Sequence, residues 1–568
     1  MGTPFDETAI DNALADLSAG EKAWAATSLR RRRELLDEIH VRTGRFAEDW
    51  VRSACAIKGL DEDSPLVGEE WMSGPLTLLQ ATAALSATLS VLETGNSPLT
   101  GITLQEAPGG RVAVPILPRG VYDRLMLNGF RGEVWLRPGV DAATARKRAG
   151  LAQLDPTATG GIGAVLGAGN ITSIPPLDAL YELYAHNRVV ALKLNPITDP
   201  LYTVFEMVFA PLLELGVLRI LTGGAAEGSY LVHHDDVAHV HMTGSAHTHD
   251  AIVWGPGQEG LERKKEHRPL LDKPITSELG GVSPTIVVPG DWSDADLRYQ
   301  AQHVATHRLH NNGYNCVAAQ AIVLSADWDR KDRFLAELRT AIERAPQRAA
   351  YYPGSDVRVA DALASYPDAK RFGPGAGRVL VEQLPHTDTP LLRNEYFSPV
   401  LGVVELPYAG GEFLHRAVDF ANTELTGTLG ANVIAHPATI RRLGIGFDRA
   451  IERLRYGAIA VNTWTGLAFL APRAAWGAFP GHTLDDVQSG IGVVHNAFLL
   501  DDVERTVVRG PFRPAPRSLV RGEPSLSPKP PWFVDNATAA TTGRRLTEFY
   551  ASANPARLPG IFLSALRG

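Results

Sequence analysis

The chain has 568 residues and a formal net charge of −8, with 45% hydrophobic and 21% charged residues. These values are typical of a soluble globular protein of about two to four domains. The acidic balance argues against a general nucleic-acid-binding surface. Only two cysteines occur, which excludes a disulfide framework or a cysteine-rich zinc site and fits a reducing compartment.

The N-terminus, MGTPFDETAIDNALADL, carries acidic residues where a secretory signal needs a basic region. A long uncharged stretch at residues 156–177 is interrupted by glycines and prolines, so it is a poor membrane helix. We therefore expect a cytoplasmic protein with no membrane partner and no nucleic-acid partner.

Residues 8–60 have apolar residues at three- and four-residue spacing, which predicts helices. The run Arg30–Arg33 is followed by Glu34, Asp37 and Glu38. Because these carboxylates lie within two helical turns, we interpret the run as a solvated, ion-paired helix face rather than a site for an anionic partner.

Short β-branched runs separated by turn residues predict strands within residues 110–138. From about residue 160, strands alternate with helices, which is typical of a parallel sheet with helical crossovers. Ligands of such sheets bind beyond the carboxyl ends of the strands. The predicted ends are Gly167–Asn170, Lys193–Pro196 and Thr222–Gly224.

A second alternating region follows, with strands at 284–290 and 318–324 and helices at 293–310 and 330–345. After residue 515 the composition shifts toward proline, serine and threonine. This shift predicts an extended surface arm, followed by one helix near 543–552.

Cys316 lies in the segment NNGYNCVAAQ, residues 311–320. Taken alone, this segment favours a small buried hydrophobic side chain, and a nucleophile is the alternative. Six further segments bear on the choice: GAGN with Asn170, ALKLNP with Lys193, HMTGS with Ser245, SELGG with Glu278, RNEYFSPV with Glu395 and GAIAVNTW with Asn462.

In order and near spacing, these segments resemble the signature set of the aldehyde dehydrogenase superfamily, from about Trp24 to about Gly492. The resemblance implies an α/β fold with two doubly wound α/β domains and a β-hairpin oligomerisation element. It implies a discontinuous nucleotide-binding domain at 1–109 and 139–278 and a catalytic domain at 279–480. The oligomerisation or bridging strands would lie at 110–138 and 481–515, with a C-terminal extension at 516–568.

The resemblance also assigns chemistry to three residues. Cys316 would add to an aldehyde as a thiolate, giving a thiohemiacetal and then, after hydride loss, a thioester. The Asn170 amide and the Cys316 backbone N–H would stabilise the oxyanion. Glu278 would activate the water that hydrolyses the thioester. A free thiol is mostly protonated at neutral pH, so a base or a positive field must assist Cys316.

The same resemblance implies NAD as the cofactor. Lys193 would bind the adenosine ribose, and Glu395, with Phe397 beside it, the nicotinamide ribose. The remaining cofactor-binding residues would be Gly224, Gly228, Gly244, Ser245, Leu279 and Gly280. Pro196 stands where a glutamate often disfavours a 2′-phosphate, so NADP stays open.

The chain departs from the family pattern at several points. Ala168 and Gly169 precede Asn170 where a bulkier pair is usual. Residues 246–277 look like an insertion, and the extension at 516–568 matches nothing in the pattern. Candidate entrance-tunnel aromatics are Trp464, Phe469 and Trp476, although packing alone explains such residues as well.

The predicted function is therefore oxidation of a small-molecule aldehyde to a carboxylate by a homodimer or homotetramer. Two alternatives remain, a coenzyme A-acylating dehydrogenase and a catalytically silent nucleotide-binding scaffold. Six histidines between His233 and His249 suggest a third, a metal-dependent hydrolase. The strand and cofactor turn already occupy that stretch, so we expect no metal site there.

Overall fold

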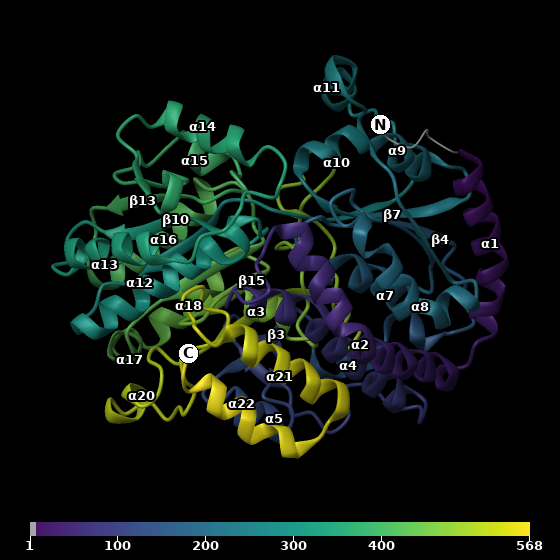
Figure 1. Cartoon of the computed structure of the whole chain (residues 1–568), viewed down its shortest axis with the longest axis horizontal. Coiled ribbons are helices and arrows are strands. Elements are labelled where there is room, and N and C mark those ends of the chain that lie inside the picture. Colours follow the sequence, from purple (N-terminus) through teal and green to yellow (C-terminus); the bar gives the residue numbers. More distant parts are fainter. Residues whose placement is uncertain (1–6) are drawn as a thin grey trace.

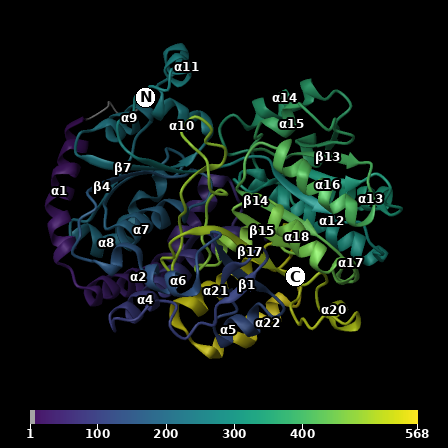
Figure 2. The same cartoon turned by 180° about the vertical axis from the view of Figure 1, so that it is seen from behind.

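The computed structural model describes residues 7–568, which form two β-sheets surrounded by helices (Figures 1 and 2). The smaller sheet has six strands in the order β16-β8-β7-β4-β5-β6. The larger sheet has 11 strands in the order β1-β2-β3-β17-β15-β14-β9-β10-β13-β12-β11. The predicted α/β fold with two sheets is thereby confirmed.

Five strands of the smaller sheet are parallel, and only the short β16 runs antiparallel, beside β8. Their bounds are β4 Ile162–Leu166, β5 Val189–Lys193, β6 Leu218–Leu221, β7 Val237–Gly244, β8 Ile275–Leu279 and β16 Gly490–Ile491. The crossover helices are α7 (Ile174–His186), α8 (Tyr202–Glu214) and α9 (Ala225–His233). The central strands β4 and β5 are almost continuously apolar because they are buried on both faces.

The larger sheet combines a parallel centre with antiparallel strands at both ends. Its strands are β1 Gln105–Ala107, β2 Arg111–Leu117, β3 Arg131–Leu136, β9 Ser283–Val287, β10 Ala319–Ser325, β11 Lys370–Phe372, β12 Arg378–Val381, β13 Val400–Leu406, β14 Gly430–Ile434, β15 Ala458–Val461 and β17 Val503–Arg509. Strand β17 pairs in parallel with β15 and antiparallel with β3. Strands β2, β3 and β17, from the segments 110–138 and 481–515, therefore extend the larger sheet of this chain, whereas β16, also within 481–515, belongs to the smaller sheet.

The N-terminal helices follow the predicted periodicity. They are α1 (Glu7–Ala26) and α2 (Leu29–Lys58). The Ser28 side chain caps the N-terminus of α2 by accepting a hydrogen bond from the Arg31 N–H. The interpretation of Arg30–Arg33 as a solvated face is wrong for Arg32. Its guanidinium is buried, donates to the side chains of Gln153 and Asn187, and lies 4.1 Å from the Trp24 ring centroid.

The remaining helices cover the two sheets (Figures 1 and 2). They are α3 Val67–Trp71, a π-helical turn Met72–Leu76, α4 Thr77–Leu92, α5 Val121–Met126, α6 Ala142–Arg148, α10 Ala246–Val253, α11 Gly257–Lys265, α12 Asp294–Leu309, α13 Lys331–Arg344, α14 Ser355–Ser365, α15 Pro390–Arg393, α16 Gly410–Thr423, α17 Pro437–Leu443, α18 Ile445–Arg453 and α19 Gly466–Leu470. Within residues 7–568, one segment, Val67–Leu92, is long and apolar enough to cross a membrane, and 61% of its most apolar window is buried inside the protein.

The C-terminal residues contradict the predicted surface arm. Three helices occur there, α20 (Arg517–Val520), α21 (Ala539–Ser552) and α22 (Leu558–Ala565), and Trp532 and Phe533 are buried. Helix α21 packs tightly on α3, since a Cβ at Gly68 would lie 2.4 Å from the Ala539 backbone. Figure 1 shows α21 and α22 beside α5, below the junction of the two halves. An aromatic cluster, not a polar surface, therefore anchors this extension.

Candidate active site

The predicted catalytic residues come from three segments of the chain that meet at one site. Asn170 follows β4, Glu278 lies near the end of β8, and Cys316 lies between α12 and β10. Asn170 and Cys316 line one small cavity of about 40 Å³, enough for one or two waters. The other cysteine, Cys55, is buried in α2 among apolar side chains.

The segment before Cys316 has an unusual backbone. Asn311, Asn312 and Gly313 have φ values of 51°, 56° and 79°, three consecutive residues in the left-handed region. Asparagine and glycine tolerate this region best, which explains the NNG sequence. Each left-handed asparagine costs free energy that surrounding contacts must offset. The Asn311 N–H donates to Glu69 Oε2 at 2.9 Å, and its side-chain amide donates to the backbone oxygens of Asn170 and Tyr314.

Asn170 is buried and held by the cysteine loop. Its Nδ2 donates one hydrogen to the Tyr314 backbone oxygen at 2.9 Å. A carboxamide nitrogen has two hydrogens, so the second remains for the cavity. Gly169 allows this packing, because a Cβ there would lie 2.8 Å from Asn195 Oδ1. The departure from the family pattern at this position therefore has a local reason.

Glu278 and Cys316 perturb each other's protonation. Burial, which is the larger effect, and the neighbouring Asp178 charge raise the pKa of Glu278 to about 7. Burial and the Glu278 carboxyl raise the pKa of the Cys316 thiol above its usual range. The Glu278 Oε1 atom is buried without a hydrogen-bond partner. A carboxyl with a pKa near neutrality beside a protonated thiol is suited to proton transfer.

A second buried carboxyl, Glu395, lies close to the same region. Burial raises its pKa to about 8, and Glu278 adds to the increase. A Cβ at Gly280 would lie 1.9 Å from Glu395 Oε1, so only glycine fits at this position. Phe397 has a φ of 39° and packs against Tyr352. Leu279, which ends β8, is buried.

Aromatic side chains line the Cys316 cavity. Trp464, Phe469 and Trp476, the candidate tunnel residues, all lie in its wall. Trp532 of the C-terminal extension lines it too, and sequence reasoning missed this residue. The run Pro530–Val534 contains two aromatic residues, an unusual composition for a solvated arm, and this was the available signal.

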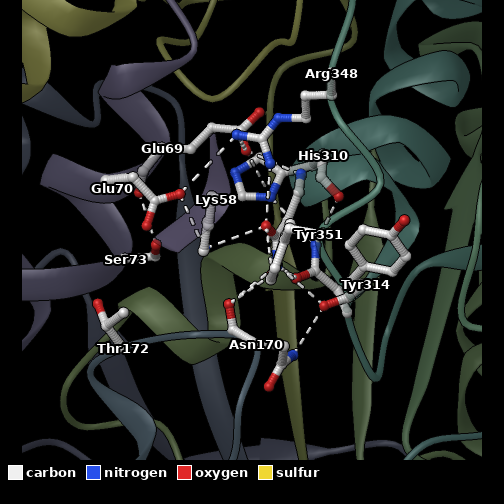
Figure 3. A network of polar contacts seen from close by, with 12 residues as sticks. Lys58, Glu69, Glu70, Ser73, Asn170, Thr172, His310, Tyr314, Arg348 and Tyr351 are labelled. Carbon is white, nitrogen blue, oxygen red and sulfur yellow. Dashed lines mark hydrogen bonds and ion pairs between the residues drawn. The ribbon is translucent and has the colours of Figure 1, made fainter. Parts of the chain in front are cut away.

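A buried charged network lies behind the cysteine loop (Figure 3). Lys58 Nζ donates to Glu70 Oε1 at 2.9 Å, and Arg348 Nη2 lies 2.8 Å from Glu69 Oε2. Both cations also donate to Asn311 Oδ1, at 3.2 and 3.0 Å. The four charges balance, so the network fixes Asn311 without leaving an unpaired buried charge. Sequence reasoning missed these residues, although the pair Glu69-Glu70 within an apolar helix was a signal.

The residues predicted to bind adenosine lie at the ends of β5, β6 and β7. Lys193 Nζ donates to the Gly223 backbone oxygen, and burial lowers its pKa. Gly224 precedes α9, and Ser245 caps α10 by accepting from the Thr248 N–H at 3.1 Å. Gly228 is buried in α9, and Gly244 ends β7. This buried lysine among glycine turns at strand ends, with Glu395 held against Gly280, fits a dinucleotide.

The histidines between His233 and His249 do not gather into a metal site. His239 Nδ1 lies 3.4 Å from Glu182 Oε2, and His241 Nδ1 lies 2.9 Å from Thr276 Oγ1. Residues 7–568 contain no group of three or more histidine, cysteine or acidic side chains arranged to hold a metal ion. The buried histidines are instead paired within the protein.

The fold and the site define a two-sheet α/β protein with a cysteine at a cavity, and comparison with known proteins agrees. A sequence model described as "Aldehyde dehydrogenase family" matches residues 178–357. D-glyceraldehyde dehydrogenase (NADP(+)) of Picrophilus torridus is 25% identical over 270 residues, 44% of this chain and 49% of that protein. Aminoacetaldehyde dehydrogenase of Pseudomonas aeruginosa is 27% identical over 269 residues, again 44% and 49%. The matched part thus spans about half the length of these relatives.

Solved structures extend the likeness over most of the chain. Aldehyde dehydrogenase KauB from Pseudomonas aeruginosa has a TM-score of 0.57 and 18% identity, with 89% of each chain covered. NAD-dependent aldehyde dehydrogenase from Sinorhizobium meliloti has a TM-score of 0.56 and 18% identity, covering 89% of this chain and 88% of that chain. At these identities the structures establish the fold alone. The sequence matches show a likeness to the aldehyde dehydrogenase family over part of the chain, including residues 178–357.

Proposed function

We propose that the protein oxidises an aldehyde to a carboxylate, with Cys316 as the nucleophile and Glu278 as the base. The observation that carries this proposal is the pairing of a cavity-facing thiol with a buried carboxyl whose pKa is about 7. A thiol with a raised pKa does not ionise by itself at neutral pH, so it needs a nearby acceptor for its proton. Glu278 is that acceptor.

In the first step, the Glu278 carboxylate takes the thiol proton while Cys316 sulfur bonds to the aldehyde carbon. The carbonyl electron pair moves to oxygen, and the free hydrogen of Asn170 Nδ2 stabilises the resulting oxyanion. One such donor lowers the activation barrier by about 3–4 kcal/mol. Asn170 is suited to this role because its other hydrogen bond fixes the amide against the cysteine loop.

Glu395, Gly280 and Lys193 would hold NAD(P)⁺. When bound, this cofactor supplies the two-electron acceptor that leaves the substrate carbon as a thioester on Cys316. The relatives include an enzyme named for NADP and one named for NAD. We propose NAD for this chain, with NADP as the second candidate because Pro196 carries no charge to repel a 2′-phosphate.

In the last step, Glu278 acts a second time, after the proton that it took from the thiol has passed to solvent. Its carboxylate takes a proton from water, the water oxygen bonds to the thioester carbon, and the C–S bond breaks to release the carboxylate product. The Cys316 sulfur leaves with the bonding pair and regains a proton. A carboxyl with a pKa of about 7 is half ionised at neutral pH, so it can accept and return this proton.

Hydrolysis of p-nitrophenyl acetate tests the proposal without knowledge of the natural aldehyde. The wild type should show a nitrophenolate burst of one equivalent followed by steady turnover, and Cys316→Ala should show neither. Cys55→Ala is the matched control, because Cys55 is the only other cysteine and burial raises its pKa to about 12.

The same assay separates the proposal from its alternatives. A burst without turnover would show that the acyl enzyme forms but water does not hydrolyse it, and would favour another acyl acceptor, such as coenzyme A. Equal, negligible release from wild type and Cys316→Ala would contradict a nucleophilic cysteine and favour a silent scaffold. Nicotinamide reduction with a simple aldehyde, followed by absorbance, then tests the redox step itself.

A further inference from the structure

A large apolar chamber lies beside the Cys316 cavity and is built partly by the C-terminal extension. Its volume is about 540 Å³, within the range of about 300–1,000 Å³ for small-molecule sites. One wall comes from α4, α5 and the loop after α19. The other comes from the extension, through Trp532, Leu546, Tyr550, Ile561 and Phe562. Figures 1 and 2 both show α5 beside α21 and α22.

The chamber and the Cys316 cavity share part of their walls. Met72, Leu470 and Trp532 line both spaces, so at these positions only one layer of side chains separates the chamber from the cavity with the thiol. Met72 and Trp532 are buried, and Leu470 is partly buried. All three are apolar or aromatic, so the boundary suits a hydrocarbon chain and not a polar group.

The chamber also has an apolar outer rim. Leu125, Leu526 and Leu566 line it, and they are 49%, 63% and 67% exposed. The two charged side chains in the lining have partners elsewhere. Asp123 accepts from the backbone N–H of Arg119, and Arg473 lies over the Phe498 ring. A ligand entering past these leucines therefore meets a mainly hydrocarbon surface.

We propose that this chamber binds the hydrocarbon tail of a long-chain aliphatic aldehyde whose carbonyl reaches Cys316. The inferred substrate class depends on the proposed function. The existence of the chamber depends only on how the extension packs. A short polar aldehyde would leave the apolar walls in contact with water, whereas an alkyl chain removes them from it. The extension thus acts as a wall of the substrate site.

A series of straight-chain aldehydes from acetaldehyde to dodecanal tests this proposal. The value of kcat/KM should rise about fourfold for each methylene that enters the chamber and then level off. Ala565→Phe, which fills part of the chamber, should lower kcat/KM for decanal by about 16-fold if it displaces two methylenes. Acetaldehyde should be unaffected. Ala556→Phe on the exposed surface of the extension is the matched control.

Ala83→Phe fills the chamber from the opposite wall and serves if Ala565→Phe does not fold. Active enzyme with a flat chain-length series would overturn the proposal. The proposal would also be overturned if kcat/KM did not change with chain length and either variant dissociated a dimer of the wild type. The chamber would then be a contact between subunits.

Failure of the proposed function is distinguished by a binding measurement. If no aldehyde is oxidised, titration calorimetry with decanoate and acetate measures binding to the chamber independently of catalysis. Decanoate binding that Ala565→Phe weakens and Ala556→Phe does not would support the chamber. No binding of decanoate would overturn it.

Discussion

Replacing Glu278 by glutamine should stabilise the protein in alkaline solution and remove its turnover. The Glu278 carboxyl is buried, and its pKa is about 7 in the folded protein against an ordinary value of 4.5. Because the folded-state value is the higher one, the folded protein keeps a proton that the unfolded chain releases. The stability that this proton contributes is present below about pH 4.5 and is lost as pH rises through about 7.

The size of the effect follows from the same two values. A shift from 4.5 to about 7 corresponds to roughly 3 kcal/mol lost between acidic solution and pH 8. Glutamine has the same shape and does not titrate. The Glu278→Gln variant should therefore gain stability over the wild type by about this amount as pH rises from 4.5 to 8.

Two measurements check the reasoning. Urea unfolding at pH 5 and pH 8 compares the two proteins, and the expected result is a variant advantage that grows with pH. In the p-nitrophenyl acetate assay, wild-type turnover should fall about tenfold per pH unit below 7. Glu278→Gln should lose about 10²- to 10⁴-fold at pH 8 in the rate of the burst and in the turnover that follows it, because Glu278 acts as base in both steps. An equal difference in unfolding free energy between variant and wild type at both pH values would refute the raised pKa of Glu278. Unchanged turnover in the variant would refute its role as base.

Three further outcomes follow from the site. Asn170→Ala should slow acylation by about 10²- to 10³-fold with little change in product release, measured from the burst phase; an unchanged burst rate would exclude the amide from the oxyanion site. Lys58→Met leaves Glu70 buried without its hydrogen-bond partner and should cost about 3–5 kcal/mol, which thermal unfolding detects; a shift of less than one degree would contradict this pairing. Gly280→Ala forces a Cβ against Glu395 and should abolish nucleotide binding measured by calorimetry, whereas wild-type affinity would show that Glu395 does not contact the nucleotide.

The sequence predicted the elements that carry a strong local pattern. Alternating apolar runs correctly placed β4, β5, β6, β9 and β10 and the helices between them, because parallel strands buried on both faces are recognisably apolar. The NNG segment was also informative, since few residue types accept a left-handed backbone.

Long-range packing was not predictable in the same way. Arg32 belongs to an arginine run whose other members are exposed or partly exposed, and its burial depends on carbonyl and amide groups more than 120 residues away. The extension after residue 515 has the composition of a loop, yet its burial is decided by the apolar surface that α3, α5 and the turn Met72–Leu76 offer it. Tertiary contacts decide both positions. The arginine run gives no local signal of them, and the extension gives only the aromatic pair Trp532-Phe533.

The buried charges behind the cysteine loop are best explained by positioning. A buried ion pair contributes little net stability, because desolvation offsets its attraction. Lys58 and Arg348 nevertheless converge on one oxygen of Asn311. That residue has a strained φ of 51° and donates to the backbone of Asn170. The network therefore compensates a backbone conformation that sets the distance between the thiol and the amide, and a stability cost here is the expected consequence of a preorganised site.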